Sequence, residues 1–272
     1  MESTTIEGTV SCFLSIIVPA YNEETRLPNS LPQIIQFARD QDYAVEVIIV
    51  DDGSTDRTAE ITKEYQKEAA FISLTQVEHG GKGHAVRAGM MQAKGEFLFL
   101  CDSDLSMPIE EVTKFLPPAL DGYDVAIASR EVEGAHRYDE PGYRHLMGRV
   151  FNLIVRLLAV HGIQDTQAGF KCFRRHVARQ LFPLQTISGW GFDVEILFIA
   201  QRRGMQIVEV PISWYYADRS QVKPVQDTYN MLREVLKVRL NAWQGRYNPA
   251  SKDTDPQTNN SANQQTQQIS KL

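Results

Sequence analysis

The chain has 272 residues, of which 43% are hydrophobic and 23% charged, a composition that suits a globular α/β protein and excludes disorder throughout. Twenty-eight Lys and Arg against 34 Asp and Glu give a formal net charge of −6, which argues against a dedicated nucleic-acid-binding protein. Its 3 cysteines are far apart and form no CxxC pair, which argues against a disulfide framework or a zinc site and favours a reducing compartment.

Short apolar runs alternate with helix-like segments along the first half of the chain. Runs with the length of buried strands lie at 14–19, 45–50, 71–75, 96–100 and 124–129, with a late one at 206–214. Between the first five we expect helices near 27–39, 55–69, 83–94 and 109–120. Continuous apolar strands that alternate with helices indicate a mostly parallel sheet covered on both faces. The carboxyl ends of such strands share one edge, where open α/β sheets bind ligands.

The second half of the chain predicts longer helices and a polar end. We expect an apolar helix near 143–161 and two further helices, with a basic, aromatic-containing helix candidate at 225–246. Residues 14–247 then form one domain, after an N-terminal extension at 1–13. Residues 248–272 are rich in Gln, Asn, Ser and Thr, so we expect a disordered tail. The N-terminus lacks a signal-peptide pattern and no apolar run is long enough to span a bilayer, so we expect a cytoplasmic location.

Acidic residues follow two of the expected strands. Asp51 and Asp52 end the second, while Asp102 and Asp104 follow the fourth. Any one of them could be a helix cap or a turn residue. Four carboxylates at one edge repel one another, however, unless a cation or hydrogen-bond donors of a ligand lie among them. Two carboxylates with phosphate oxygens and water make a Mg²⁺ or Mn²⁺ site.

A glycine-rich segment, His79–His84, follows the third expected strand and opens a helix. Glycines allow the backbone to approach a ligand closely, and Lys82 supplies positive charge near a phosphate. A flexible connection without a ligand is the alternative. The chain contains neither a GxxxxGKS/T nor a GxGxxG motif, so a diphosphate here would need a divalent ion to neutralise it.

These motifs resemble those of the inverting family 2 glycosyltransferases, which have the GT-A fold. The matching segments are PAYNE at 19–23, VDDGSTD at 50–56, GKG at 81–83, DSD at 102–104, DTQAGFK at 165–171 and WGFDVE at 190–195. Within that family the chain most resembles dolichyl-phosphate β-glucosyltransferases and related polyprenyl-phosphate enzymes. The resemblance implies a Rossmann-like, mostly parallel sheet flanked by helices, with amphipathic helices toward the C-terminus.

The resemblance also implies roles for individual residues. A nucleotide-sugar donor would be held by Pro19, Tyr21, Glu23, Asp52, Lys82 and Asp102. A Mg²⁺ or Mn²⁺ ion would bind Asp102 and Asp104. A polyprenyl-phosphate acceptor would be bound by Arg130, Arg144, Lys171 and Lys223. Catalysis would depend on Asp104, Arg130, Arg144 and Lys171.

The implied reaction is the inverting transfer of a hexose, glucose from UDP-glucose first, to the phosphate of a polyprenyl or dolichyl phosphate. A GDP-mannose-dependent mannosyltransferase is one alternative, because PAYNE and VDDGSTD do not separate the two nucleotides. Another is a soluble enzyme acting on a hydroxyl, which would need Asp193 or a neighbour as general base. A non-catalytic nucleotide-sugar sensor is the third.

Two helices are candidates for peripheral contact with the cytoplasmic face of a membrane. In the helix near 143–161, a polar stripe of His145, Arg149, Asn152 and Arg156 is surrounded by apolar residues. Such a helix could lie in the headgroup plane, or it could pack on the sheet with a polar rim. The same two interpretations are open for the helix at 225–246.

Overall fold

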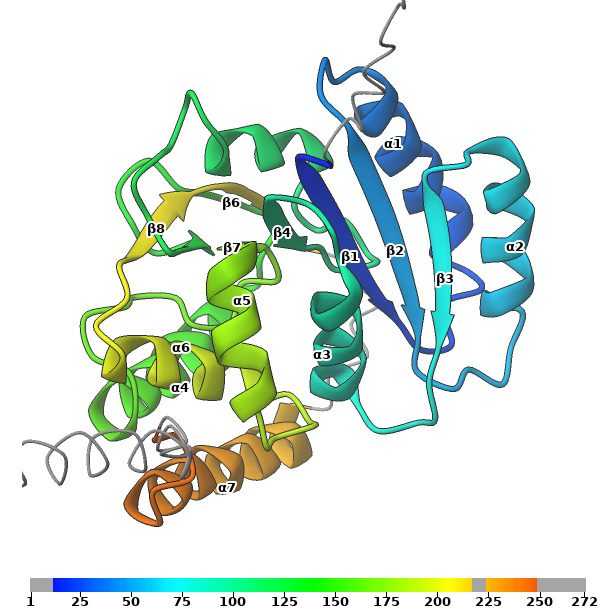
Figure 1. Cartoon of the computed structure of the whole chain (residues 1–272). Coiled ribbons are helices and arrows are strands. Elements are labelled where there is room, and N and C mark those ends of the chain that lie inside the picture. The colour runs from blue at the N-terminus through cyan, green and yellow to red at the C-terminus, as the bar shows by residue number, and fades with distance from the viewer. Residues whose placement is uncertain (1–11, 217–223, 249–272) are drawn as a thin grey trace, which may run out of the picture.

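The computed structural model describes residues 12–216 and 224–248, and the side chains of these residues except at 143–144 and 224–229 (Figure 1). The expected extension before residue 12 and the tail after residue 248 lie outside the described residues. Within them, seven strands form one sheet in the order β3-β2-β1-β4-β7-β5-β8. Their bounds are β1 (Leu14–Ala20), β2 (Val45–Asp51), β3 (Ile72–Gln76), β4 (Phe97–Leu100), β5 (Val125–Ser129), β7 (Lys171–Arg174) and β8 (Ile207–Pro211).

The sheet is parallel except for β7, which runs antiparallel between β4 and β5. The expected strands in the first half are confirmed, but β7 was not predicted, because its four residues give too short a pattern. The single late strand expected at 206–214 is wrong. The chain there divides into β8 and a short β9 (Ser213–Tyr215), which leaves the main sheet and pairs with β6 (His136–Tyr138).

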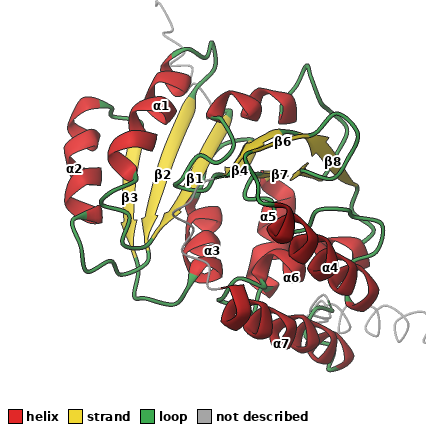
Figure 2. Ribbon diagram, turned by 180° about the vertical axis from the view of Figure 1, so that it is seen from behind, coloured by secondary structure: helices red, strands yellow, loops and turns green. Residues whose placement is uncertain are grey.

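Helices cover both faces of the sheet. One face carries α1 (Leu27–Arg39), α2 (Thr58–Glu68) and the 3₁₀ helix η1 (Ile109–Phe115). The other carries α3 (Lys82–Gln92), α4 (Gly142–Leu158), α5 (Arg175–Leu181), the short 3₁₀ helix η2 (Phe182–Leu184), α6 (Phe192–Arg202) and α7 (Pro224–Trp243). Figure 2 shows α1 and α2 against β1–β3 from one side, and Figure 1 shows α3 from the other.

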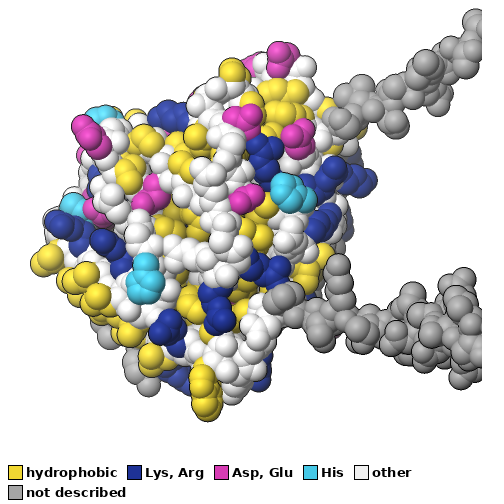
Figure 3. Space-filling view, turned by 60° about the vertical axis from the view of Figure 1, so that its left-hand side comes forward, with side chains coloured by type: hydrophobic (Ala, Val, Ile, Leu, Met, Phe, Trp, Pro, Cys, Tyr) yellow, Lys and Arg dark blue, Asp and Glu magenta, His cyan; other side chains and the backbone are white. Residues whose placement is uncertain are grey.

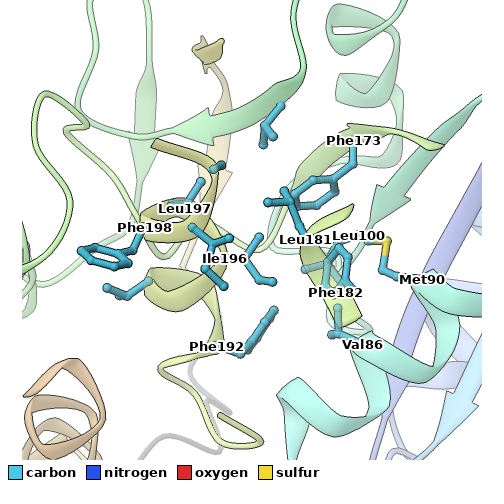
Figure 4. Close-up of a cluster of buried hydrophobic side chains, with 14 of the residues drawn as sticks. Val86, Met90, Leu100, Phe173, Leu181, Phe182, Phe192, Ile196, Leu197 and Phe198 are labelled. Atoms are coloured by element: carbon cyan, nitrogen blue, oxygen red, sulfur yellow. The ribbon is translucent and has the colours of Figure 1, made fainter. Parts of the chain in front are cut away.

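Alternation along each strand divides the core into two apolar clusters. In β1, Leu14 and Ile16 face the α1–α2 side, whereas Ile17 faces α3. The cluster on the α3 side continues through α5 and α6, where Phe182 and Phe192 pack toward α3 (Figure 4). Each fully buried side chain of this size contributes about 1.5–3 kcal/mol by leaving water. The sheet is therefore a rigid support for the segments at its edges.

Two expected helices differ from the prediction in a way that the residues explain. The α-helix expected at 109–120 is instead a 3₁₀ helix that ends at Phe115, because Pro117 and Pro118 provide no N–H donors to continue it. Of the C-terminal helices, α7 has an exposed and a buried side, but α6 is buried on all sides from Phe192 to Ala200. A helix enclosed in this way forms part of the core.

Candidate active site

The carboxyl ends of β1, β2 and β4 bring acidic segments to one edge of the sheet. β1 lies between β2 and β4, so the segment beginning at Tyr21 lies between Asp52 and Asp102. The start of β7 reaches the same edge because this strand is antiparallel to β4, with Lys171 opposite Leu100. The expected convergence of polar strand ends is therefore present, and β7 adds a cation to it.

Asp52 is buried under the glycine-rich connection that precedes α3. Its carboxylate accepts hydrogen bonds from the backbone N–H groups of Gly80 (3.0 Å) and Gly81 (2.8 Å), and Nδ1 of His79 lies 2.9 Å from Oδ2. The rings of Tyr21 and His79 stack with centroids 4.2 Å apart. Asp52 thus fixes the connection, and the stacked rings form the flat apolar wall that suits a planar base.

Pro19 and Glu23 lie at the end of β1. Pro19 is buried within the strand, and Glu23 is buried just beyond it, where Oε1 lies 3.1 Å from Nη1 of Arg26. Burial raises the pKa of Glu23; Arg26 opposes this rise and the negative charge of Asp104 adds to it. The ends of β1 and β4 therefore share a region of concentrated negative charge.

Asp102 and Asp104 are the two carboxylates at this edge that could hold a divalent cation. Asp102 is half-buried, whereas Asp104 is exposed and its Oδ1 accepts a hydrogen bond from the Ser106 N–H (3.0 Å). Among the described residues, no group of three or more His, Cys, Asp and Glu side chains could hold a metal ion alone. This donor set fits Mg²⁺ or Mn²⁺ bound to a nucleotide, since Mg²⁺ is usually held by one or two carboxylates together with substrate phosphates.

Lys82, the first residue of α3, partly compensates this negative charge. Its Nζ lies 2.7 Å from Oδ1 of Asp102 and 4.9 Å from the ring centroid of Trp190. Although burial favours the neutral amine, the carboxylates of Asp102 and Asp193 raise the pKa of Lys82, so its side chain is an ammonium at neutral pH. A cation at a helix N-terminus beside the carboxylate of Asp102 is well placed for a diphosphate.

Lys171 and Asp193 form a buried ion pair next to Lys82. Nζ of Lys171 lies 2.8 Å from Oδ1 of Asp193 and donates a hydrogen bond to the Ala168 carbonyl (2.7 Å). Burial raises the pKa of Asp193, and the charges of Lys171 and Lys82 oppose that rise. Lys171 is the first residue of β7 and is almost fully buried. Its ammonium neutralises Asp193 inside the protein.

Arg130 follows β5 and forms a two-point ion pair with Asp165. Its Nε and Nη2 donate hydrogen bonds of 2.7 and 3.0 Å to the two carboxylate oxygens, and its guanidinium lies 5.3 Å from the ring of Trp214. Asp165 is buried; burial opposes ionisation, but the Arg130 charge and hydrogen bonds lower its pKa to about 2. The structure therefore places Arg130 on the DTQAGFK segment. The side chain of Arg144 and all of Lys223 lie outside the described residues.

Three site features were missed in the sequence. Asp165 and Gly169 belong to the quoted DTQAGFK motif, but their contacts depend on β7: a Cβ on Gly169 would lie 2.0 Å from Oδ2 of Asp102. Trp190 was noted only as part of a motif, and its contact with Lys82 depends on how α3 and α6 meet. Glu234, which accepts a hydrogen bond from the Gly191 N–H (2.6 Å), has no signal in the sequence.

The outward side of α4 is apolar. Exposed hydrophobic residues lie at helical spacing along it: Leu146, Val150, Leu153 and Leu157, with Met147 beside them. The expected continuous polar stripe is wrong at Asn152, which is buried and whose Oδ1 accepts a hydrogen bond from the Thr166 hydroxyl (3.2 Å). Phe151 and Val155 anchor the inner side. The inner side of α4 therefore packs on the core, as one of the two interpretations expected, but its outer side is apolar and not a polar rim.

The helix α7 packs against α4 and has an apolar outer side of its own. Leu236, Leu240 and Trp243 are exposed at spacings of four and three residues, Trp243 by 86%. At the lower edge of Figure 3, the height at which α7 lies in Figure 1, hydrophobic side chains occur among Lys and Arg. Within the described ranges, no helix combines the length and apolar character needed to cross a bilayer.

A comparison with protein families identifies this arrangement. Residues 15–182 match the model of Glycosyl transferase family 2. The chain belongs to this family. This match confirms the family resemblance that PAYNE, VDDGSTD and DSD indicated. The protein is therefore an enzyme that transfers a sugar.

Individual relatives are similar over most of the chain. The dolichyl-phosphate beta-glucosyltransferase of Dictyostelium discoideum is 33% identical over 242 residues, which cover 84% of this chain and 74% of that protein. The Homo sapiens protein of the same name is also 33% identical over 242 residues, 84% of this chain and 75% of its own.

Solved structures confirm the fold. Glucosyl-3-phosphoglycerate synthase from Mycobacterium tuberculosis in complex with UDP superposes with a TM-score of 0.61 at 22% identity, covering 89% of this chain and 82% of that one. A structure of the same enzyme with Mn²⁺, UDP and glucosyl-3-phosphoglycerate gives 0.61 at 21% identity, with the same coverage. The expected GT-A-like α/β architecture is therefore confirmed.

Proposed function

We propose that this glycosyltransferase transfers glucose from UDP-glucose to the phosphate of a polyprenyl or dolichyl phosphate, with inversion to a β-linked product. The observation that carries the proposal is the similarity to dolichyl-phosphate beta-glucosyltransferases over 84% of the chain. The charges at the sheet edge support it, since they suit a nucleotide diphosphate and a cation.

For the donor, the proposal uses the residues at the ends of β1, β2 and β4. Tyr21 and His79 form the wall for the base, and Lys82 faces the diphosphate. Asp102 and Asp104 would hold Mg²⁺ or Mn²⁺, which neutralises the diphosphate and makes UDP a better leaving group. The structures of the mycobacterial synthase with Mn²⁺ and UDP support a divalent ion in this fold.

For the acceptor, the environment of Asp193 favours a phosphate over a hydroxyl. A hydroxyl needs a general base, whereas a phosphate monoester has a second pKa of about 6 and is largely a dianion at neutral pH. Asp193 is buried and paired with Lys171, so it is not placed as an open base. A phosphate oxygen can attack the sugar carbon directly, on the side opposite the leaving nucleotide.

The attacking dianion must be held against the negative charge of the donor. We assign this task to Arg130, Arg144 and Lys223, with Lys171 acting from inside. The ion pair with Asp165 uses Nε and Nη2 of Arg130, so an acceptor phosphate would meet Nη1. This division lets one arginine both fix the DTQAGFK segment and face the acceptor.

We also propose that the enzyme works as a peripheral protein on the cytoplasmic face of a membrane. The exposed apolar side of α4, with Leu146, Val150, Leu153 and Leu157, supports this role. Arg149 and Arg156 are exposed on the same helix and can contact anionic headgroups. A polyprenyl-phosphate acceptor resides in a membrane, so contact of the apolar side of α4 with the lipids would bring the enzyme to its acceptor.

The test is transfer from radiolabelled UDP-glucose and, in parallel, GDP-mannose to a short polyprenyl phosphate in detergent with Mn²⁺ or Mg²⁺. We expect a chloroform-soluble product from UDP-glucose alone, abolished by EDTA and by Asp104→Ala. Product from GDP-mannose alone would show that the donor is GDP-mannose and the transferred sugar mannose. Nucleotide release without a lipid product, on addition of free sugars or glycans, would refute the lipid acceptor, and loss of that release in Asp193→Asn would identify a hydroxyl acceptor.

A further inference from the structure

The turn before α6 lies between the start of α3 and the middle of α7. On the α3 side, the Ser188 carbonyl accepts a hydrogen bond from the His84 N–H (3.2 Å), and a Cβ on Gly81 would lie 2.7 Å from that carbonyl oxygen. On the α7 side, a Cβ on Gly189 would lie 2.3 Å from Oε1 of Glu234. The turn therefore has no spare room on either side.

Glu234 joins this turn to α7 by a direct hydrogen bond. Its Oε2 accepts the Gly191 N–H at 2.6 Å, and a Cβ on Gly191 would lie 2.7 Å from the same oxygen. Next to Gly191, Phe192 is buried in the cluster that reaches Val86 of α3 (Figure 4). The carboxylate thus fits a space that only two glycines leave open.

A second contact holds the same segment to the same side of α7. Nδ2 of Asn241 donates a hydrogen bond to the Thr186 hydroxyl (2.8 Å) and lies seven residues, about two turns, after Glu234. Val238, halfway between them, is fully buried. The buried stripe of α7 therefore holds segment 186–191 at both ends.

Trp190 lies between the two glycines, Gly189 and Gly191, and its side chain connects the turn to the donor site. Trp190 is 36% exposed, and the centroid of its ring lies 4.9 Å from Nζ of Lys82, close enough for a cation–π contact. Nζ of Lys82 in turn lies 2.7 Å from Asp102. A displacement of the turn would move the ring away from the ammonium.

We propose that Glu234 is a positioning residue for the donor site. It holds the Gly189–Gly191 turn against α7, which keeps Trp190 on Lys82 and the ammonium beside Asp102, where the diphosphate binds. The inference rests on the proposed function for the identity of the nucleotide. The series of contacts from Glu234 through the turn and Trp190 to Lys82 does not depend on the acceptor.

The experiment measures UDP and GDP binding to the full chain with Mn²⁺ by calorimetry, for the wild type and Glu234→Ala, Glu234→Gln and Asn230→Ala. We expect Glu234→Ala to weaken nucleotide binding about tenfold, the equivalent of one lost hydrogen bond. Glu234→Gln keeps an acceptor for the Gly191 N–H and should stay near the wild type. Asn230→Ala, exposed one turn earlier on α7, is the matched control.

Acrylamide quenching of Trp190 emission, obtained as the difference from Trp190→Phe, provides a second measurement that needs no nucleotide. Quenching should increase in Glu234→Ala and not in Glu234→Gln. If Glu234→Ala does not fold, Gly191→Ala perturbs the contact from the other side; its φ of −72° is allowed for alanine, so backbone strain is not added. The same weakening and quenching are expected there.

Unchanged nucleotide affinity and unchanged quenching in Glu234→Ala would overturn the inference. So would a Glu234→Gln variant as impaired as Glu234→Ala, since the hydrogen-bond acceptor would then not be what matters. If the wild type binds neither nucleotide, the proposed donor is wrong, and the quenching difference still decides whether Glu234 positions Trp190.

Discussion

Replacing Gly169 by alanine should disable the donor site while leaving the fold intact. The added Cβ would lie 2.0 Å from Oδ2 and 2.5 Å from Cγ of Asp102. An ordinary contact needs roughly 3.5 Å, so the carboxylate must withdraw by about 1.5 Å. The backbone at Gly169 does not lie in the left-handed region, so the effect comes from this contact alone.

The magnitude follows from where the carboxylate can go. The side chain of Asp102 is 28% exposed, so it can turn toward solvent, and the unfolding free energy should fall by only about 1–2 kcal/mol. Leaving its position breaks the contact with Lys82 and displaces one of the two carboxylates that we propose as ligands of the metal ion. A misplacement of about 1 Å at reacting groups costs on the order of 100-fold in rate.

The assay combines Mn²⁺ binding by electron paramagnetic resonance, sugar transfer from the proposed donor, and urea unfolding. Gly148→Ala is the control, because Gly148 lies in α4 with nothing within 4 Å of an added Cβ. A folded Gly169→Ala enzyme with wild-type Mn²⁺ affinity and wild-type transfer would refute the reasoning, since Asp102 would then tolerate the methyl group without moving.

Four further predictions follow from the charges and the exposed surface. Asp104→Asn should lower transfer at least about 100-fold and raise the Mn²⁺ concentration needed for half-maximal rate, measured by metal titration. The pKa of Asp165 is about 2 in the folded protein against a usual 3.8, so its ionised carboxylate stabilises the fold by about 2 kcal/mol above pH 3.8. This stabilisation is lost as the pH falls toward 2, and the unfolding free energy of Asp165→Asn, measured with urea, should lack that part of the acid dependence. Arg130→Met should cost about 3–5 kcal/mol in the same assay at pH 7, because it leaves a buried carboxylate unpaired. Leu153→Glu with Leu157→Glu should reduce sedimentation with phosphatidylglycerol vesicles but leave nucleotide binding unchanged, and equal sedimentation would contradict a lipid-facing α4.

Much of the fold could be predicted because its signals are local. Continuous apolar runs such as 45–50 read as buried strands in any context, and polar residues directly after them had to meet at one edge once the sheet was parallel. The carboxylates Asp102 and Asp104 could be found in the same way. Their position follows from the end of one strand.

The rest of the site depends on contacts between distant segments. Arg130 reads as a free cation in the sequence, but the fold places Asp165 within its reach, 35 residues away. Lys171 reads as a loop residue until the fourth and seventh strands pair. Asn152 reads as part of a polar stripe, because helical spacing alone does not say which side a helix buries. No local pattern contains these partners.

The antiparallel direction of β7 also affects how substrate preference can change in this fold. Parallel strands present the loops that leave them, but β7 presents the segment that enters it, residues 165–170, immediately before Lys171 pairs with Leu100 and Ile127. That segment is anchored downstream by the sheet, while the connection from α4 upstream is outside the sheet. At its start the ion pair of Asp165 with Arg130 fixes the segment as well, so only the connection before Asp165 can vary in length without shifting the strand register or Asp102.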